Sequence, residues 1–203
     1  NVEEKWVRVQ PGIVLDQLNA TLAPHGLHFA PDPATSSRAT IGGMIGNNSS
    51  GTKSIVYGTT REHVLELKTV FSDSTVMDLA PIARDKFDAQ PKILSDFKKI
   101  IDDNRDEIEK RFPKVMRRVQ GYNLDSFIDT DSWNLAELMV GSEGTLGVFL
   151  EAKLNLEPLP KHKALCVAHF DDLLESIQTV APILQHSPSA VEIVNADVLV
   201  LAR

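Results

Sequence analysis

The sequence has 203 residues, of which 42% are hydrophobic and 24% charged, and its formal net charge is -7. This length suits one large domain, or one domain with part of a second, and it lets the chain bury most of its apolar surface. Nucleic acid is not expected as the main partner, because the chain is acidic and has no block of like charges. The single cysteine, Cys166, excludes an internal disulfide and a cysteine metal cluster.

No run of about eighteen apolar residues is present, so the sequence predicts no transmembrane helix. There is no signal peptide at the start of the sequence, and we expect a cytoplasmic protein that could associate peripherally with a membrane. The six histidines show no metal-ligand spacing, and no metal site is predicted. Both ends of the sequence are abrupt, so the remainder of a parent chain is expected.

The first sixty residues predict a strand, a helix, a loop and a glycine-rich stretch. Residues 5–12, KWVRVQPG, alternate apolar and polar side chains and then reach a Pro-Gly turn, as a short strand does. Residues 13–26 carry apolar residues at helical spacing. Residues 29–40, FAPDPATSSRAT, are typical of a loop. Residues 39–60, ATIGGMIGNNSSGTKSIVYGTT, then hold five glycines.

The middle of the sequence mixes strand and helix patterns. Residues 63–71 and 75–79 alternate in polarity around Ser-Asp-Ser, which predicts a hairpin. An apolar stripe at helical spacing over residues 91–112 predicts one long surface helix. Residues 134–147, NLAELMVGSEGTLG, indicate a short helix broken by glycines, and the apolar residues of 145–160 repeat at a strict period of two, the strongest strand signal in the chain.

The last part of the sequence changes to a strand, helix, strand rhythm. Residues 164–170 (ALCVAHF) and 190–194 (AVEIV) resemble strands, and residues 172–187 resemble a helix. Within ALCVAHF, Cys166 is expected to be a small buried hydrophobe. The mixture of elements and the hairpin favour an α+β fold. Neither a Rossmann fingerprint nor a P-loop is present.

Two glycine clusters carry the functional signal. Glycine lets backbone approach a ligand closely, and successive exposed amides can hold phosphate without positive side chains. Residues 40–51, TIGGMIGNNSSG, and residues 141–147, GSEGTLG, could face one long ligand from two segments. The alternative is that both clusters are tight turns that serve the topology of the fold.

These motifs resemble those of flavin-dependent oxidoreductases of the vanillyl-alcohol oxidase and p-cresol methylhydroxylase type. The chain is most similar to the FAD-linked D-2-hydroxyacid dehydrogenases that act on D-lactate, glycolate or D-2-hydroxyglutarate. The matching pieces, in the family's order, are PDPATSSRATIGGMIGNNSSG, VYGTTREHVLELKTVF, GYNLD, NLAELMVGSEGTLGVFLEAKLNLEPLP and SAVEIVNADVL.

The resemblance implies a division into two parts. Residues 1–158 would be the second FAD-binding subdomain, with an antiparallel or mixed sheet flanked by helices, and residues 159–203 would begin an α+β substrate (cap) domain. The family's phosphate loop, of the form RGxGTS, is missing from this sequence. We therefore expect an incomplete FAD site, with FAD bound in the complete protein and none held by this piece alone.

By the same resemblance, one set of residues would line the cofactor: Pro31, Ile41, Gly42, Gly43, Asn48, Ser49, Gly51, Tyr57, Gly58, Glu143, Gly144 and Gly147. From the residues alone, Tyr57 could equally be a core aromatic and Glu143 a turn residue. Arg38 is interpreted as a solvated loop residue, and His63 as structural rather than a base. No catalytic base is identified in this sequence.

The family implies oxidation of the C–H bond beside the hydroxyl of a small 2-hydroxy acid, with hydride transfer to flavin N5 and onward transfer to an electron acceptor. Two alternatives stay open. One is a non-catalytic folded fragment that does not bind FAD tightly by itself. The other is an FAD-fold reductase with another substrate.

Overall fold

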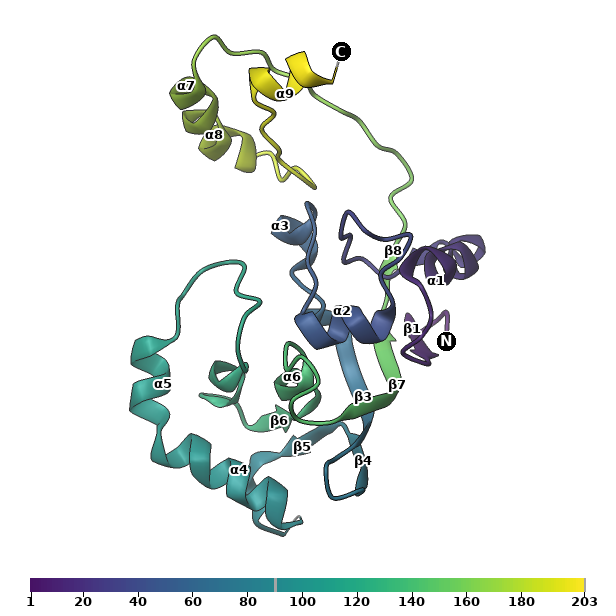
Figure 1. The fold of residues 1–203 in the computed structure, drawn as a ribbon, viewed down its shortest axis with the longest axis vertical. Helices are drawn as coiled ribbons and strands as arrows, with labels where there is room; N and C mark the ends of the chain where they lie inside the picture. Colours follow the sequence, from purple (N-terminus) through teal and green to yellow (C-terminus); the bar gives the residue numbers. More distant parts are fainter. Residues whose placement is uncertain (90, 203) are drawn as a thin grey trace.

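A four-stranded antiparallel sheet lies at the centre of the molecule (Figure 1). The structure, a computed structural model, describes residues 1–89 and 91–202. The strand order is β1-β7-β3-β4, with β1 at Trp6–Val9, β7 at Val148–Asn155, β3 at Val64–Val70 and β4 at Val76–Leu79. The predicted first strand, hairpin and long strand are all confirmed, because each alternating segment found a neighbour to pair with.

Two small sheets and nine α-helices complete the described part of the chain. One small sheet pairs β2 (Leu27–His28) with β8 (Glu157–Pro158), and the other pairs β5 (Pro81–Ala83) with β6 (Ser132–Asn134). The helices are α1 Leu15–Leu22, α2 Ile41–Asn47, α3 Ser54–Tyr57, α4 Lys92–Asp103, α5 Arg105–Arg111, α6 Ala136–Met139, α7 Leu173–Gln178, α8 Val180–Leu184 and α9 Ala196–Leu201. Short 3-10 turns lie at Ala23–His25, Arg61–His63, Arg84–Ala89 and Leu124–Phe127.

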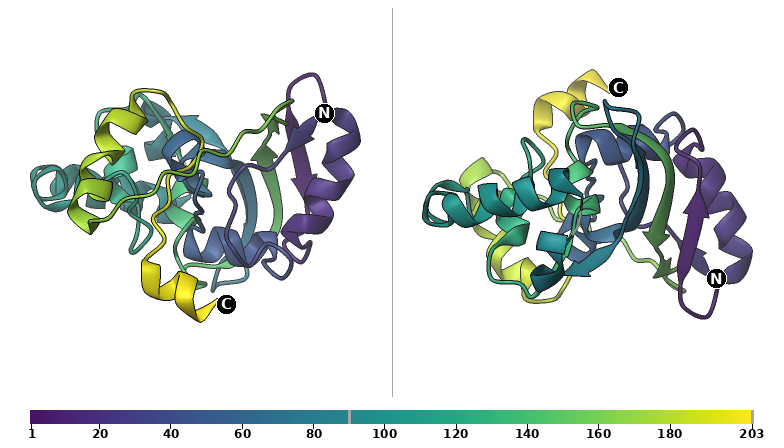
Figure 2. Two further views of the ribbon diagram at one scale, coloured as in Figure 1. Left: turned by 90° about the horizontal axis from the view of Figure 1, so that it is seen from above. Right: turned by 90° about the horizontal axis from the view of Figure 1, so that it is seen from below.

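The core joins one face of the sheet to α1 and α2. Leu67 of β3 and Leu154 of β7 are buried, as are Leu18 of α1 and Met44 of α2. A second part of the core is aromatic, with edge-to-face contacts among Phe87, Phe97, Phe127 and Trp133 at centroid distances of 4.9 to 6.0 Å. The two views of Figure 2 place α1 and the pair α4 and α5 at opposite ends of the molecule, with the sheet between them.

The predicted long helix is interrupted once. Asn104 separates α4 from α5 with φ -117° and ψ 13°, and its side-chain amide donates to the carbonyl of Ile100 at 2.8 Å. Asparagine side chains compete with the backbone for helical hydrogen bonds, which explains the break. The apolar stripe continues across it, since Ile101 and Ile108 are both buried.

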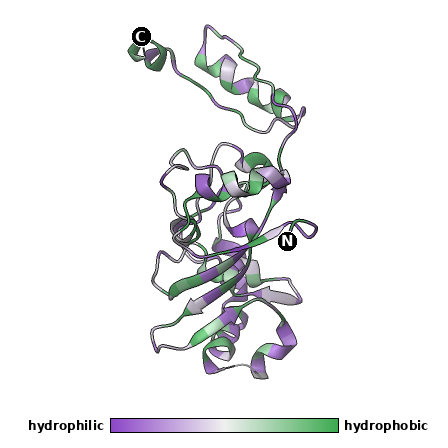
Figure 3. Cartoon of the chain, turned by 90° about the vertical axis from the view of Figure 1, so that its right-hand side faces the viewer, coloured by the Kyte–Doolittle hydropathy of each residue, from purple (hydrophilic) through white to green (hydrophobic). Residues whose placement is uncertain are grey.

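The C-terminal segment differs most from the sequence-based expectations. Residues 164–170 and 190–194 form no strand, and residues 172–187 form two short helices, α7 and α8. Cys166 is exposed, not buried. An extended segment becomes a strand only when another strand pairs with it, and none of the described residues does so here. Figures 1 and 3 show this segment apart from the sheet, and the colours of Figure 3 mark hydrophobic residues along it.

Candidate functional site

The glycine-rich stretch begins as a helix. The side-chain oxygen of Thr40 caps α2 by accepting from the amide of Gly43 at 3.2 Å. Ile41, Met44 and Ile45 are buried at helical spacing, which anchors α2 in spite of its glycines. The helix ends at Asn48, whose φ of 52° is left-handed. The Thr40 cap and the buried apolar side chains of α2 therefore hold this stretch in a helix.

The amides at the start of α2 are already paired within the chain. Ile41 donates to the carbonyl of Ile13 at 2.9 Å, and Gly42 donates to the carbonyl of Pro11 at 2.8 Å. A Cβ at Gly42 would lie 2.6 Å from the Cβ of Pro11, so this glycine permits close packing. With Gly43 held by Thr40, these amides are not free to cradle a phosphate, and contact of Ile41, Gly42 and Gly43 with FAD stays a prediction.

The second glycine cluster lies directly on the end of α2. Gly141 donates its amide to the carbonyl of Ile45 at 2.9 Å, and Glu143 donates to the carbonyl of Gly46 at 2.9 Å. These bonds satisfy carbonyls that the last turn of a helix would otherwise leave unpaired. Gly141 has φ 84° and Glu143 has φ 51°. The two clusters, far apart in sequence, are thus joined by backbone hydrogen bonds.

Two buried polar atoms at this contact have no partner among the residues that the structure describes. Asn48 is fully buried and Ser142 is 2% exposed, and neither the Nδ2 of Asn48 nor the Oγ of Ser142 makes a hydrogen bond. Buried polar groups are nearly always paired. Unpaired polar atoms at the junction of the two glycine clusters are groups that could bind a polar ligand.

Gly51 lies against the loop residue Asp32, which directly follows Pro31. A Cβ at Gly51 would lie 2.1 Å from the carbonyl oxygen of Asp32, so only glycine fits there. The Asp32 carboxylate accepts from the amide of Lys53 at 3.2 Å and pairs with its ammonium at 3.3 Å. Ser49 lies nearby in the chain, and its hydroxyl donates to the side chain of Asn47 at 2.6 Å.

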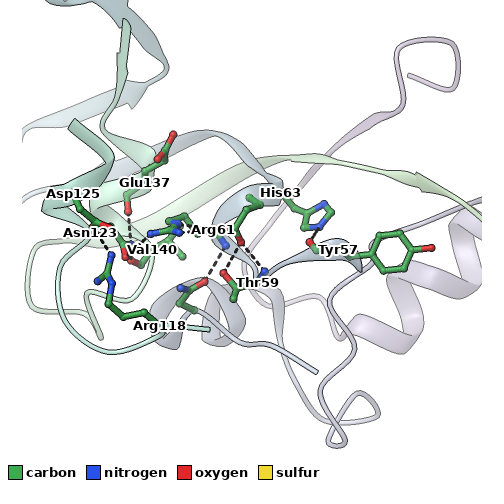
Figure 4. A network of polar contacts seen from close by, with 11 residues as sticks. Tyr57, Thr59, Arg61, His63, Arg118, Asn123, Asp125, Glu137 and Val140 are labelled. Carbon is green, nitrogen blue, oxygen red and sulfur yellow. Dashed lines mark hydrogen bonds and ion pairs between the residues drawn. The ribbon is translucent and has the colours of Figure 1, made fainter. Parts of the chain in front are cut away.

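The turn at Tyr57 and Gly58 closes the stretch. The carbonyl of Tyr57 lies 2.7 Å from the Nε2 of His63, and the Tyr57 ring packs edge-on against His28 at 5.8 Å. Gly58 has φ 70°. Figure 4 shows the Tyr57 ring pointing away from the polar cluster beside this turn. Tyr57 thus packs against a neighbouring ring and is half-buried, and its contact with FAD stays a prediction.

A polar cluster around Arg61, which the sequence did not single out, joins these segments (Figure 4). The Arg61 guanidinium donates to Asn123 at 3.1 Å and to Glu62 at 2.9 Å, and the Arg61 amide donates to the side chain of Asn48 at 2.9 Å. Asn123 lies within the matching piece GYNLD, and Arg61 and Glu62 lie within VYGTTREHVLELKTVF, but the sequence assigned none of the three a role.

The pKa values of two carboxylates near this cluster are shifted in opposite directions. Burial works to raise the pKa of Glu62, but hydrogen bonds from Thr59 and Arg61 outweigh it, so the pKa of Glu62 is lowered. Burial also acts on Glu137, and there it prevails over a hydrogen bond from Ser126 and the charge of Arg61, so the pKa of Glu137 is raised. Glu62 is therefore the charged partner of Arg61.

The remaining sequence-predicted residues are placed as follows. Gly144 has φ 76°, and a Cβ at Gly147 would lie 2.7 Å from the side chain of Thr69, so Gly147 packs on β3. Arg38 is exposed, and His63 is buried beside Phe29. Among the residues that the structure describes, no group of histidine, cysteine or carboxylate side chains could hold a metal ion.

A cleft of about 420 Å³ lies on the other side of Arg61. Thr59, Arg61 and Arg118 line it together with the end of α5 and the residues that follow. None of the predicted FAD residues lines it. Arg61 thus lines this cleft and also binds Asn48 at the end of α2.

One known protein family matches the part of the chain that holds the first glycine cluster. Residues 1–80 match the family described as "FAD binding domain". This match bears out the recognition made from the sequence and confirms FAD as the cofactor at the level of the family.

Curated relatives align along the whole chain. A D-2-hydroxyglutarate dehydrogenase of Pseudomonas putida is 41% identical over 100% of this chain and 21% of its own length, and the one of Escherichia coli is 35% identical over the same shares. Glycolate oxidase subunit GlcD of Bacillus subtilis is 27% identical over 98% of this chain and 34% of its length. The chain thus spans about a fifth of the dehydrogenases it matches.

A solved structure supports the fold. Alkyldihydroxyacetonephosphate synthase superposes with a TM-score of 0.58 and 18% identity, over 94% of this chain and 26% of that one. At this identity the likeness concerns the fold alone, and it confirms the α+β class.

The residues present fit FAD as a ligand. FAD is long, and its diphosphate and ring edges take hydrogen bonds from neutral donors. The unpaired Nδ2 of Asn48 and Oγ of Ser142 are such groups. The left-handed glycines of the second cluster allow close approach of backbone.

Proposed function

We propose that this chain forms one side of the FAD site of a flavin-dependent oxidoreductase that acts on a 2-hydroxy acid. The observation that carries the proposal is the contact between the two glycine clusters, where Glu143 donates to the carbonyl of Gly46 at 2.9 Å. This contact brings the unpaired polar atoms of Asn48 and Ser142 close to glycines that are in the left-handed conformation. The family match over residues 1–80 supports FAD as the occupant.

Each group of residues has a proposed part in holding the cofactor. Asn48 and Ser142 would donate to its polar atoms, and the backbone from Glu143 to Gly144 would approach it closely. Pro31, Ser49, Gly51, Tyr57 and Gly58 would line the same ligand farther along. When bound, FAD would supply a flavin that accepts a hydride at N5 from the carbon bearing the substrate hydroxyl. The role of this chain's residues is to bind and orient, and none is assigned as the base.

The proposed substrate is D-2-hydroxyglutarate, before D-lactate or glycolate. Relatives named D-2-hydroxyglutarate dehydrogenase are 35% to 41% identical to the chain, whereas relatives named for D-lactate or glycolate are 27% to 31% identical. An electron acceptor would be the second partner. No helix in residues 1–89 and 91–202 is long and apolar enough to cross a membrane. A cytoplasmic location, or a peripheral one at a membrane, stays a prediction.

We also propose that residues 1–158 are the FAD-binding part and that residues 159–203 begin the substrate domain. The support is the change in burial. Leu154 and Leu156 are buried, whereas Leu165 is 89% exposed and apolar side chains remain exposed through Leu201 at 87%. Exposed apolar side chains in such number are typical of a surface that packs against another domain or protein.

Spectroscopy of the complete gene product tests the enzyme proposal. The purified protein is expected to show flavin absorbance, and anaerobic addition of D-2-hydroxyglutarate should bleach it faster than D-lactate or glycolate does. A colourless protein that cannot be reconstituted with FAD would overturn the proposal. Bleaching by none of the three acids would retain FAD binding and remove the substrate class.

The second candidate concerns the 203 residues by themselves: a folded piece that does not hold FAD tightly. The paired amides of Ile41, Gly42 and Gly43 favour it, because they leave few donors on α2 for a diphosphate. Titration calorimetry of this piece with FAD decides the matter. Micromolar or tighter binding would refute this candidate.

A further inference from the structure

We propose that Arg61 and Asn123 are positioning residues for the cofactor, acting through the backbone segments that they join. This inference rests on the proposed FAD site. The two side chains connect three segments that carry proposed FAD residues: the end of α2 at Asn48, the turn at Gly58, and the second glycine cluster at Gly141. These segments are loops and short helices, whose relative register the central sheet does not fix.

The first link fixes the orientation of the Asn48 amide. The backbone N–H of Arg61 donates to the Oδ1 of Asn48 at 2.9 Å. Because Oδ1 is used in this bond, Nδ2 is left as the donor, and it is the atom that is buried without a partner. The position of Arg61 thus decides which face of the Asn48 amide a ligand would meet.

The second link runs to the turn at Gly58. The Nε and Nη2 of Arg61 donate to one oxygen of Glu62 at 3.1 and 2.9 Å. The other oxygen of Glu62 accepts from the amide and the hydroxyl of Thr59 at 2.6 and 2.7 Å. That oxygen would lie 2.9 Å from a Cβ at Gly58, so the carboxylate lies directly against this turn.

The third link runs through Asn123 to the second cluster. The Nη1 of Arg61 donates to the Oδ1 of Asn123 at 3.1 Å. Asn123 is 1% exposed, and its Nδ2 donates to the carbonyls of Glu137 and Val140 at 2.9 and 2.8 Å. Val140 directly precedes Gly141, whose amide binds Ile45 at 2.9 Å.

These links close a ring of contacts. One path joins α2 to Gly141 directly through the backbone, and the other reaches the same point through Arg61 and Asn123. The side chains of Arg61 and Asn123 are both paired in this network, which holds the segments that they join in one arrangement. Its loss should loosen the register between the two glycine clusters while the central sheet, whose strands pair independently, stays formed.

The test uses the complete gene product with the variants Arg61→Ala, Arg61→Lys and Asn123→Asp. Arg8→Ala is the matched control, because Arg8 also bridges two side chains, Glu66 at 2.6 Å and Glu151 at 3.0 Å, but on the edge strand β1 of the sheet. The readouts are the dissociation constant for FAD, the visible circular dichroism of the bound flavin, and the far-ultraviolet spectrum of the apoprotein.

Arg61→Ala and Asn123→Asp are expected to weaken FAD binding by about tenfold or more and to change the flavin dichroism. Arg61→Lys should recover only part of the affinity, because one ammonium cannot reproduce the planar fork that binds Glu62 and Asn123 together. Arg8→Ala should keep both the affinity and the flavin spectrum of the wild type.

The outcomes separate this inference from the proposed function. A wild-type protein that binds no FAD overturns the proposed function, and this inference with it. If the wild type binds FAD and the Arg61 and Asn123 variants match it in affinity and flavin spectrum, only this inference fails. If all three variants lose the apoprotein fold, the pair is structural rather than positioning, and the inference also fails.

Discussion

The amide of Glu143 donates to the carbonyl of Gly46 across 2.9 Å, although the two residues are nearly a hundred positions apart. This bond, with its neighbour from Gly141 to Ile45, makes the second glycine cluster the cap of the helix that the first cluster forms. The φ of 51° at Glu143 places its amide there. The proposed cofactor site thus lies where the end of α2 is capped by the distant segment from Gly141 to Glu143.

The glycine at position 51 should be essential to the fold. In Gly51→Ala the new Cβ would lie 2.1 Å from the backbone carbonyl of Asp32, which cannot move without shifting the loop. We expect a loss of about 1–3 kcal/mol in the free energy of unfolding, measured by urea denaturation. Gly46→Ala is the control, since nothing lies within 4 Å of its Cβ, and in a helix it should leave stability equal or higher. Equal stabilities for the two variants would contradict this packing.

The turn at Gly58 should resist substitution for a different reason. Gly58 has φ 70° and ψ -144°, a region that only glycine enters readily. Gly58→Ala should therefore cost about 1–3 kcal/mol of stability by thermal or urea unfolding. Gly12→Ala should be close to neutral, because its Cβ meets nothing within 4 Å and no left-handed angle is needed. A neutral Gly58→Ala would mean that the turn relaxes freely.

His28 should make the protein less stable in acid. Burial lowers the pKa of His28, with Lys53, Lys163 and His63 acting in the same direction and Glu157 opposing them. The unfolded chain then binds a proton that the folded chain resists, so stability is full above the unfolded pKa of about 6.5 and falls as the pH drops below it. Urea unfolding from pH 8 downward should show this fall. The His28→Gln variant should flatten it, whereas the same change at the exposed His186 should not.

Glu137 should have the opposite dependence. Burial raises its pKa in the folded protein, so the folded chain holds a proton more readily than the unfolded chain does. The contribution to stability is present below the unfolded pKa of about 4.3 and is lost as the pH rises. Glu137→Gln should therefore stabilise the protein at neutral pH and change little in acid. Unfolding curves of both proteins at two pH values measure this, and a destabilised variant at neutral pH would contradict it.

Local patterns predicted most of the elements, because alternation and helical spacing report which side of a segment is apolar. The strands at residues 6–9, 64–70 and 148–155 and the helix at 15–22 were recognised in this way. Asn104 was missed because one polar residue does not disturb an apolar stripe, yet its side chain can interrupt the helix. The strands expected at 164–170 and 190–194 failed because alternation cannot supply a pairing strand.

The same contrast holds for the candidate site. The sequence by itself determined the resemblance to FAD-linked dehydrogenases, the α+β class and the two glycine clusters, since these depend on residue types in a fixed order. Only the tertiary structure decided that the amides of Gly42 and Gly43 are already paired, that Gly141 and Glu143 cap α2, and that Arg61 and Asn123 join the segments. The physical reason is that a hydrogen bond depends on which groups meet in space, and residues 62 positions apart carry no local pattern that records their meeting.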